Sequence, residues 1–358
     1  MIPGTERATP RDSGLSTRGA PRVLKNDIRA RLAMTVAAFG TTALAACLLA
    51  PLIGSTPLSL RRVFDRSIPF ADNVDAQIFF VARLPRVLAA ALVGSTLAAA
   101  GVVFQALLRN PLATPFTLGV SAGAALGAML AITFGLEFTF GHLPAVPVAS
   151  FAGALGAVGI VYAMARARHR GFSTTVLLLA GVTLNSFFSA LILFVQYLAD
   201  FSQTFRTVRW LMGDLDIGSY APILAALPFA TVSLGAFATL PRSLNILTFG
   251  PEAALSRGID AIGTQRLAFF SASLATGAAV SLGGPVGFIG IVVPHLVRLI
   301  VGSDHRLVLP ASALFGAAFL IACDVASRTL MAPTEIPVGV VTALVGGPFF
   351  LWLLIRQS

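Results

Sequence analysis

The chain has 358 residues, of which 56% are hydrophobic and 11% are charged, and its mean hydropathy is +0.86. A soluble domain carries about 25% charged residues, so this chain lacks the charge to cover a water-facing surface. Apolar stretches recur from residue 32 onward, many near the ~20 residues that cross a bilayer core. The composition therefore excludes an ordinary soluble domain and indicates an all-α polytopic membrane protein rather than a β-barrel of short alternating segments.

The net charge of +10 does not indicate a nucleic-acid partner, because the basic residues are concentrated before the first apolar stretch. Seven of the 25 lie there: Arg7, Arg11, Arg18, Arg22, Lys25, Arg29 and Arg31. Lysine and arginine beside a span are the positive-inside signal, which predicts a cytoplasmic N-terminus. No aromatic and basic platform for nucleic acid accompanies them.

In chain order, residues 1–31 are polar and predict a disordered cytoplasmic tail. Residues 32–358 predict one transmembrane domain of about ten helices. The expected spans are 32–53, 84–108, 114–134, 143–165, 173–198, 220–240, 264–282, 286–301, 308–328 and 338–356. An even number of spans returns the C-terminus to the cytoplasm. The protein is then a multi-pass protein of a bacterial inner membrane with both termini inside.

No energy source for transport is visible in the chain. Lys25 is the only lysine, and a phosphate-binding loop needs a lysine beside its glycines. The acidic residues cluster near span ends at Glu137, Asp200, Asp214, Asp216, Asp324 and Glu335, whereas ion-coupled carriers bury theirs in mid-span. An ion-coupled secondary transporter thus remains the alternative from another class. We expect no catalytic residue, no metal site and no cofactor bound by this chain, because neither the four histidines nor Cys47 and Cys323 have ligand spacing.

A segment that could receive energy from a partner lies between the sixth and seventh spans. Residues 252–258 read Glu-Ala-Ala-Leu-Ser-Arg-Gly, within a cytoplasmic loop of about 245–262. A short amphipathic helix that ends at a glycine and projects from the membrane fits a groove on another protein. The pattern is similar to the coupling loop of bacterial ABC importer permeases. In full, the predicted coupling residues are Glu252, Ala253, Ala254, Leu255, Ser256, Arg257 and Gly258.

Six further segments, taken in order, strengthen this resemblance. They are RLPR (83–86), RNPLATPFTLGVSAGAALGA (109–128), LLLAGVTLNSFFSAL (177–191), RWLMGDL (209–215), GGPVGFIGIVVPHLVRLIVGSDHR (283–306) and EIPVGVVTALVGGPFFLWLL (335–354). From about residue 35 to its end the chain resembles the FecCD/BtuC-type permeases of ABC importers for iron-siderophores, haem and vitamin B12. The resemblance implies a cobalamin-permease-like bundle of ten helices that forms a homodimer or close heterodimer. It also implies a separate cytoplasmic subunit that uses ATP and a periplasmic substrate-binding protein.

The resemblance also implies roles for individual residues. Arg83 and Arg86, with Arg328, match arginines that meet acidic residues of the binding protein; the alternative is interfacial arginines that reach the lipid headgroups. Asn110 and Leu112 match a cytoplasmic gate, which the segment Ser173, Thr174 and Thr175 would face across the dimer axis. An asparagine before a proline is also ordinary turn chemistry.

The substrate is the least determined feature of the sequence, because in such importers specificity resides in the soluble binding protein. An iron(III)-siderophore is the commonest assignment in the family and is our expectation. Haem and cobalamin permeases of the same family are the alternatives. A haem path would present an axial ligand, and Met129, Met164 and Tyr197 are candidates.

Overall fold

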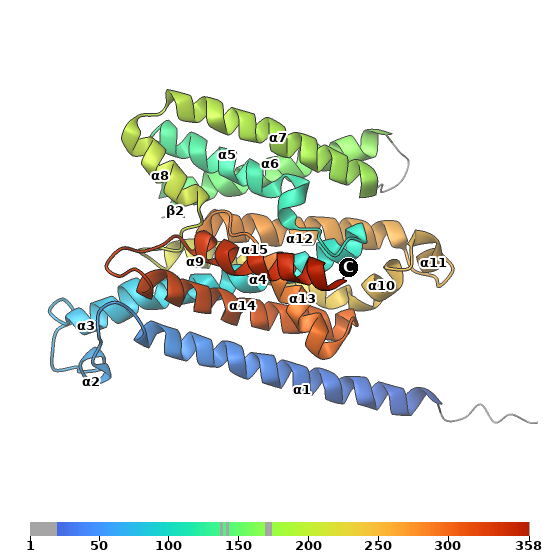
Figure 1. Cartoon of the computed structure of the whole chain (residues 1–358), viewed down its shortest axis with the longest axis horizontal. Helices are drawn as coiled ribbons and strands as arrows, with labels where there is room; N and C mark the ends of the chain where they lie inside the picture. Colours follow the sequence, from blue (N-terminus) through green and yellow to red (C-terminus); the bar gives the residue numbers. More distant parts are fainter. Residues whose placement is uncertain (1–19, 137–138, 141–142, 169–173, 358) are drawn as a thin grey trace, which may run out of the picture.

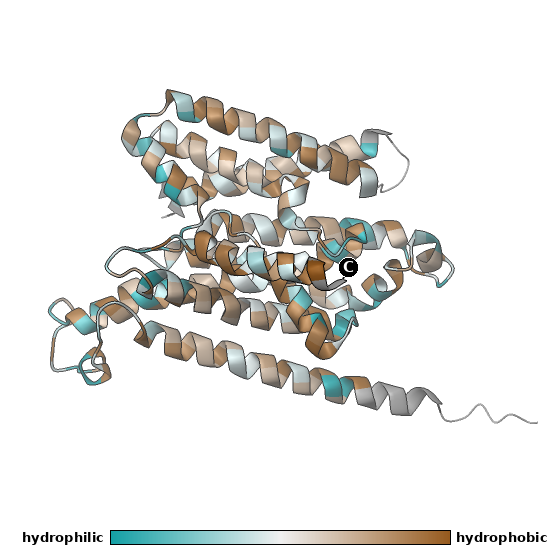
Figure 2. Ribbon diagram, viewed as in Figure 1, coloured by the Kyte–Doolittle hydropathy of each residue, from teal (hydrophilic) through white to brown (hydrophobic). Residues whose placement is uncertain are grey.

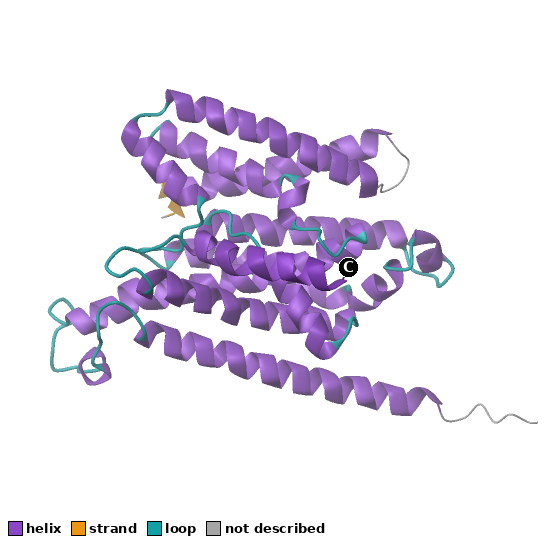
Figure 3. Ribbon diagram, in the orientation of Figure 1, coloured by secondary structure: helices purple, strands orange, loops and turns teal. Residues whose placement is uncertain are grey.

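The computed structural model describes residues 20–136, 139–140, 143–168 and 174–357. Within these ranges the chain is almost entirely helical (Figure 3). The sheet that they contain is a two-stranded antiparallel pair of β1 (Thr139–Phe140) and β2 (Leu143–Pro144), in which Phe140 pairs with Leu143. The all-α prediction is therefore confirmed.

The described residues form ten apolar helices that run back and forth through the molecule. They are α1 (Ala20–Leu49), α4 (Leu84–Leu108), α5 (Val120–Thr133), α6 (Ala145–Arg168), α7 (Thr174–Leu198), α9 (Ala221–Thr239), α12 (Ala261–Gly283), α13 (Ile289–Val301), α14 (His305–Thr329) and α15 (Val338–Gln357). All but α5, α13 and α15 belong to spans long and apolar enough to cross a membrane. The number agrees with the ten apolar runs of the sequence.

Shorter helices lie at the two ends of this bundle. They are η1 (Ala50–Leu52), α2 (Leu60–Val63), α3 (Val74–Gln77), η2 (Ile78–Arg83, a π-helix), η3 (Pro115–Leu118), α8 (Phe201–Leu211), α10 (Pro241–Leu247) and α11 (Pro251–Leu255). We call the end with residues 109–119, 240–260 and 302–304 the tail end, because α1 begins there. The opposite end, with residues 50–83, 199–220 and 330–337, is the far end (Figure 1).

The helices differ most from the predicted spans at three places. The first helix begins at Ala20, inside the segment predicted as a tail, and the second span is helical from Val74. Once a helix exists, extending it through good helix formers costs little, whatever their polarity. The third predicted span is divided at Gly119, which has φ +77° and separates η3 from α5. Residues 1–19 of the predicted tail lie outside the described residues.

The core of the bundle consists of α4, α12 and α14, whose apolar windows are mostly buried. They pack together with α9, α13 and α15, while α5 to α8 form a group along one side and α1 lies along the other (Figure 1). Glycines allow the closest crossings. A Cβ on Gly94 would lie 2.2 Å from the carbonyl oxygen of Gly316, and a Cβ on Gly101 would lie 2.2 Å from that of Gly290. Small residues that let backbones touch are typical of helix packing in membranes.

Apolar side chains also cover much of the exterior of the bundle. Figure 2 shows hydrophobic colour along the outward helices and hydrophilic colour mainly at their ends. On α7, Leu193 is 67% exposed and Phe194 is 60% exposed. A monomeric soluble protein rarely exposes an apolar surface of this extent, so these faces suit lipid or a protein partner.

Candidate functional site

The predicted coupling residues form a single helical turn at the tail end. Gly250, with φ +108°, starts the turn, and Pro251 occupies the first helical position, where a missing N–H is harmless. The helix α11 ends at Leu255 rather than at residue 258. Gly258 then takes φ +72°, and the N–H of Ile259 donates to the carbonyl of Ala254 at 2.9 Å. That 6→1 bond with a left-handed glycine is a Schellman ending.

One side of this segment packs on the bundle and the other projects away from it. Ala254 is completely buried, whereas Leu255 is 64% exposed and Phe249, just before the segment, is 77% exposed. Glu252 and Arg257 are also exposed. A protruding turn with a large apolar side chain between opposite charges has the form of a knob that inserts into a groove.

The predicted gate residues Asn110 and Leu112 form a tight turn at the end of α4. Arg109 ends the helix in the left-handed conformation, with φ 49°. The Asn110 side-chain oxygen then accepts a hydrogen bond from the Leu112 N–H at 2.9 Å, which is an Asx turn. Ordinary turn chemistry is therefore present here. Both residues also line a cavity of about 680 Å³ at the tail end, so the turn is placed where a gate could act.

The other predicted gate segment lies apart from this turn in a single chain. Ser173 lies outside the described residues, and Thr174 and Thr175 form the first turn of α7. Among the described residues, the wall of the 680 Å³ cavity contains none from α7. The prediction places the two segments on opposite sides of a dimer axis. That they face each other in a dimer stays a prediction.

A polar network behind the gate turn was not found from the sequence. Gln105 on α4 is 4% exposed; its amide donates to the Gly290 carbonyl at 2.9 Å and its oxygen accepts from Arg298 at 2.6 Å. Asn245 on α10 donates to Asp304 at 2.7 Å. These partners are far apart in sequence and occur in no local motif. The sequence signal for this network was limited to polar residues within or beside apolar runs.

Asp304 is the charged centre of this network. Burial alone would raise the pKa of its carboxyl, but hydrogen bonds from Arg306 and Asn245 outweigh burial and lower that pKa to about 2. The Arg306 guanidinium lies 2.6 Å from the carboxylate. Asp304 also caps α14, because its side chain accepts from the Arg306 N–H at 3.0 Å.

His295 lies in the middle of α13. Among the described residues its Nε2 has no hydrogen-bond partner. Its ring lies edge-on to Phe349, with centroids 6.2 Å apart, and it lines the same cavity. No group of three or more histidine, cysteine, aspartate or glutamate side chains among the described residues is placed to hold a metal ion.

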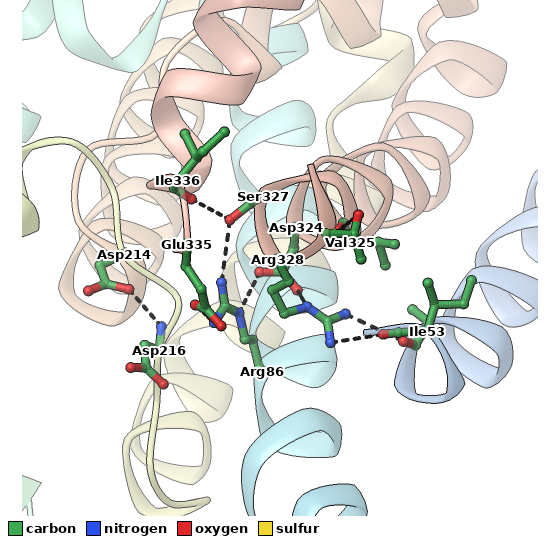
Figure 4. Close-up of polar contacts among 12 residues, drawn as sticks. Ile53, Arg86, Asp214, Asp216, Asp324, Val325, Ser327, Arg328, Glu335 and Ile336 are labelled. Carbon is green, nitrogen blue, oxygen red and sulfur yellow. Dashed lines mark hydrogen bonds and ion pairs between the residues drawn. The ribbon is translucent and has the colours of Figure 1, made fainter. Parts of the chain in front are cut away.

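The structure brings the three predicted docking arginines together at the far end but buries them, each 6% exposed. Arg86 on α4 lies 2.6 Å from Asp324 on α14 and 2.6 Å from Glu335 in the following loop. Arg328 lies 3.1 Å from the other oxygen of Asp324, which is fully buried (Figure 4).

Donors of Arg83 and Arg328 hold the backbone of residues 50–56. Arg328 donates to the Ile53 carbonyl at 3.2 Å, and Arg83 donates to the carbonyls of Pro51 at 3.2 Å and Thr56 at 2.5 Å. Gly54 permits this approach, because a Cβ there would lie 2.5 Å from the Arg83 guanidinium. The three arginines thus bind within the chain, and direct pairing with another protein would first have to break those contacts. Their docking role stays a prediction.

Charged residues at the far end line a second cavity, of about 560 Å³. Arg209 on α8, with a 46% exposed side chain, lies 2.8 Å from Asp214 and 3.5 Å from Asp216. Arg86 and Glu335 line the same cavity. The acidic residues stand out in the sequence near span ends, whereas Arg209 does not.

Comparison with known proteins places the chain in a family. The sequence profile of the FecCD transport family matches residues 42–356. The cobalamin import system permease of Halobacterium salinarum is 44% identical over 276 residues, which cover 76% of this chain and 72% of that protein. The hemin transport system permease of Yersinia pestis is 38% identical over 312 residues, 85% of this chain and 90% of that protein. An uncharacterised ABC transporter permease of Bacillus subtilis is 40% identical over 299 residues, 82% of this chain and 83% of that protein.

A solved structure has the same fold. It is described as an inward-facing conformation of a metal-chelate type ABC transporter, and it superposes with a TM-score of 0.79 at 30% identity. The match covers 90% of this chain and 98% of that one. Permeases of this kind carry out transport without catalysis and work with a separate ATPase, which removes the ion-coupled carrier as a rival. The chain belongs to the FecCD transport family and is a multi-pass permease subunit of an ABC importer.

Proposed function

We propose that this permease imports an iron(III) chelate of the siderophore class, as a homodimer that works with a cytoplasmic ATPase and a periplasmic binding protein. The observation that carries the proposal is the coupling segment, defined as residues 251–258. It is a protruding turn between two left-handed glycines, with exposed Leu255 beside exposed charges. Such a turn can transfer movement from a partner only if the partner holds it in a groove.

The distribution of charge supports a cytoplasmic tail end in the inner membrane. Described arginines at or near that end include Arg29, Arg31, Arg109, Arg166, Arg242 and Arg257. At the far end, arginines alternate with acids, as in Arg61, Arg62 and Arg66 beside Asp65 and Asp72. An excess of lysine and arginine marks loops that stay inside. Both ends of the chain are then cytoplasmic, and the far end faces the periplasm.

The names of the relatives support a metal chelate as the substrate class. Their described substrates are cobalamin, hemin and iron(III)-citrate, each a metal ion held by an organic ligand. Cobalamin is the second candidate, because the cobalamin permease of Halobacterium salinarum is 44% identical to this chain. A permease whose specificity lies in its binding protein need not differ much between these cargoes.

Docking and gating complete the proposal. The binding protein meets the far end through charge, where Arg83 and Arg328 hold the 50–56 segment, Arg86 holds Glu335 and Arg209 is exposed. The gate consists of Asn110 and Leu112 with residues 173–175 of the second copy. Complementary charge accelerates and orients such encounters more than it tightens them.

The test is ATP-driven uptake by the permease reconstituted with its cognate ATPase and binding protein in proteoliposomes. Radiolabelled ferric siderophore, hemin and cobalamin would be supplied in turn. We expect accumulation of ferric siderophore that depends on both partners. Accumulation of cobalamin alone would contradict the siderophore assignment and favour the second candidate, while labelling of a cysteine at position 252 from the periplasm would contradict the orientation.

A further inference from the structure

The coupling segment and the gate turn, residues 110–112, are neighbours at the tail end. A Cβ on Gly250 would lie 3.6 Å from the Arg109 guanidinium. Coupled transport requires that a displacement of the coupling segment be transmitted to the gate turn. The apolar contacts between helices can slide, whereas a hydrogen bond either carries its partner along or breaks. Polar contacts that connect the two segments are therefore candidates for transmitting that displacement.

The first contact joins α10, which leads into the coupling segment, to the start of α14. The Asn245 amide donates to Asp304 at 2.7 Å. Its oxygen accepts from the His305 backbone N–H at 2.9 Å and lies 2.7 Å from His305 Nδ1. Because that oxygen can only accept, Nδ1 carries the proton in this arrangement. Three polar contacts thus hold one side chain of α10 at the first turn of α14.

The second contact joins α13 to α4. Only residues 302–304 separate the start of α14 from the end of α13, so the two helices are joined by a short corner. Arg298, in the last turn of α13, donates to Gln105 at 2.6 Å. The Gln105 amide is fixed in turn on the Gly290 carbonyl at 2.9 Å, within reach because the backbones cross closely at Gly101.

The third contact joins Gln105 to the gate turn. The backbone N–H of Asn110 donates to the backbone carbonyl of Gln105 at 3.1 Å. Gln105, Asn110, Asn245 and Arg298 all line the 680 Å³ cavity. A densely packed bundle resists displacement, and this cavity provides space beside the turn for it to move.

We propose that Asn245, Arg298 and Gln105 form a relay through which displacement of the coupling segment reaches the gate turn by way of α14 and α13. They are positioning residues, because they act on the gate turn through their contacts and are not part of the turn themselves. The inference rests on the proposed function, because it assumes that a partner ATPase moves residues 251–258. The side-chain links are partly buried, and that from Gln105 to Gly290 is buried, so a lowered local dielectric strengthens them.

The test compares variants of the full complex, permease with ATPase and binding protein, in proteoliposomes. Asn245→Ala and Arg298→Ala each remove one link. We expect ATP hydrolysis stimulated by the loaded binding protein to persist while substrate imported per ATP falls about fivefold or more, as for loss of a typical coupling free energy. Because the links act in series, the double variant should transport no less per ATP than the worse single variant.

Matched substitutions separate a relay from a merely structural role. Gln105→Glu keeps the acceptor for Arg298 and gives up only the amide bond to the Gly290 carbonyl, so it should keep coupling. Gln105→Met removes both bonds and should lose coupling. Tyr220→Phe removes a hydrogen bond of 2.6 Å, to the Phe80 carbonyl at the far end. It should leave substrate per ATP unchanged even where the unfolding temperature falls equally.

Three results would overturn the relay: wild-type coupling in the Asn245 and Arg298 variants, additive losses in the double variant, or coupling that follows unfolding temperature wherever the substitution lies. If an alanine variant fails to fold, the comparison of Gln105→Glu with Gln105→Met tests the relay instead. A wild-type complex that hydrolyses ATP without any uptake would instead refute the proposed function.

Discussion

Arg86 shows how a single charged side chain is accommodated inside an apolar bundle. Its guanidinium reaches two carboxylates on different segments, Asp324 within α14 and Glu335 beyond it. Ser327, which also contacts Arg86, donates to the Ile336 carbonyl and so holds the same loop (Figure 4). Burying charges is costly, and such a group persists where each charge has a partner.

Removing this arginine should therefore destabilise the protein strongly. In Arg86→Ala the buried Asp324 keeps Arg328 as its partner and loses the shorter contact. Breaking a buried pair costs about 3–5 kcal/mol where the remaining charge is left uncompensated. Because Arg328 still compensates part of the Asp324 charge, denaturant unfolding in detergent should show a loss toward the lower end of that range.

Arg209→Ala is the matched control, since it removes an exposed ion pair at the same end. Exposed pairs contribute about 0–1 kcal/mol, so unfolding should hardly change. Equal small losses in the two variants would show that the Arg86 cluster is not a stabilising centre.

Gly258 is a second position where one residue determines a local structure. Its φ of +72° costs any residue with a Cβ roughly 1–2 kcal/mol, although the space around it is open. Gly258→Val should disturb the end of the coupling segment without a clash and lower substrate imported per ATP. The same change at exposed Gly235, which has no positive φ, should leave coupling intact. Equal coupling in both variants would show that the Gly258 turn does not engage the ATPase.

At the scale of an element, the beginning of α14 depends on Asp304. The carboxylate caps the helix, pairs with Arg306 and receives the Asn245 amide. Its lowered pKa of about 2 means that the folded state favours the ionised form. A group with a depressed pKa stabilises the fold above its unfolded pKa, and this contribution is lost as pH falls toward the folded value.

The variant Asp304→Asn isolates that charge, because asparagine also caps a helix well. We expect the variant to be less stable than wild type at neutral pH. The difference should shrink between about pH 4, the ordinary aspartate pKa, and pH 2. Unfolding temperatures measured across this range in detergent would check the expectation, and a difference independent of pH would show that the charge does not contribute.

At the scale of the whole molecule, transport requires a second protein for energy. The chain has one lysine, Lys25, and no phosphate-binding loop. The permease and binding protein without the ATPase should accumulate no substrate under a proton or sodium gradient. Adding the ATPase with ATP should restore uptake. Accumulation driven by the gradient alone would contradict the coupling described above.

The amino-acid sequence by itself determined the class of the protein and the course of its chain. Hydropathy is a local property, so ten apolar runs predicted ten helices, and Gly258 predicted the end of the coupling turn. Helix extension into polar residues, as at Ala20, was invisible to hydropathy because helix propensity continues where hydrophobicity stops.

Only the tertiary structure decided which polar groups meet. Arg86 and Asp324 are 238 positions apart, and Gln105 and Arg298 are 193 apart. No local pattern records such pairs, since they depend on which helices cross and how closely. Glycines at those crossings set the distance, as at Gly101 and Gly290. Arg86 and Arg328 are buried because the α14 carboxylate lies within their reach, and Arg83 is buried where the carbonyls of residues 51 and 56 accept its hydrogen bonds.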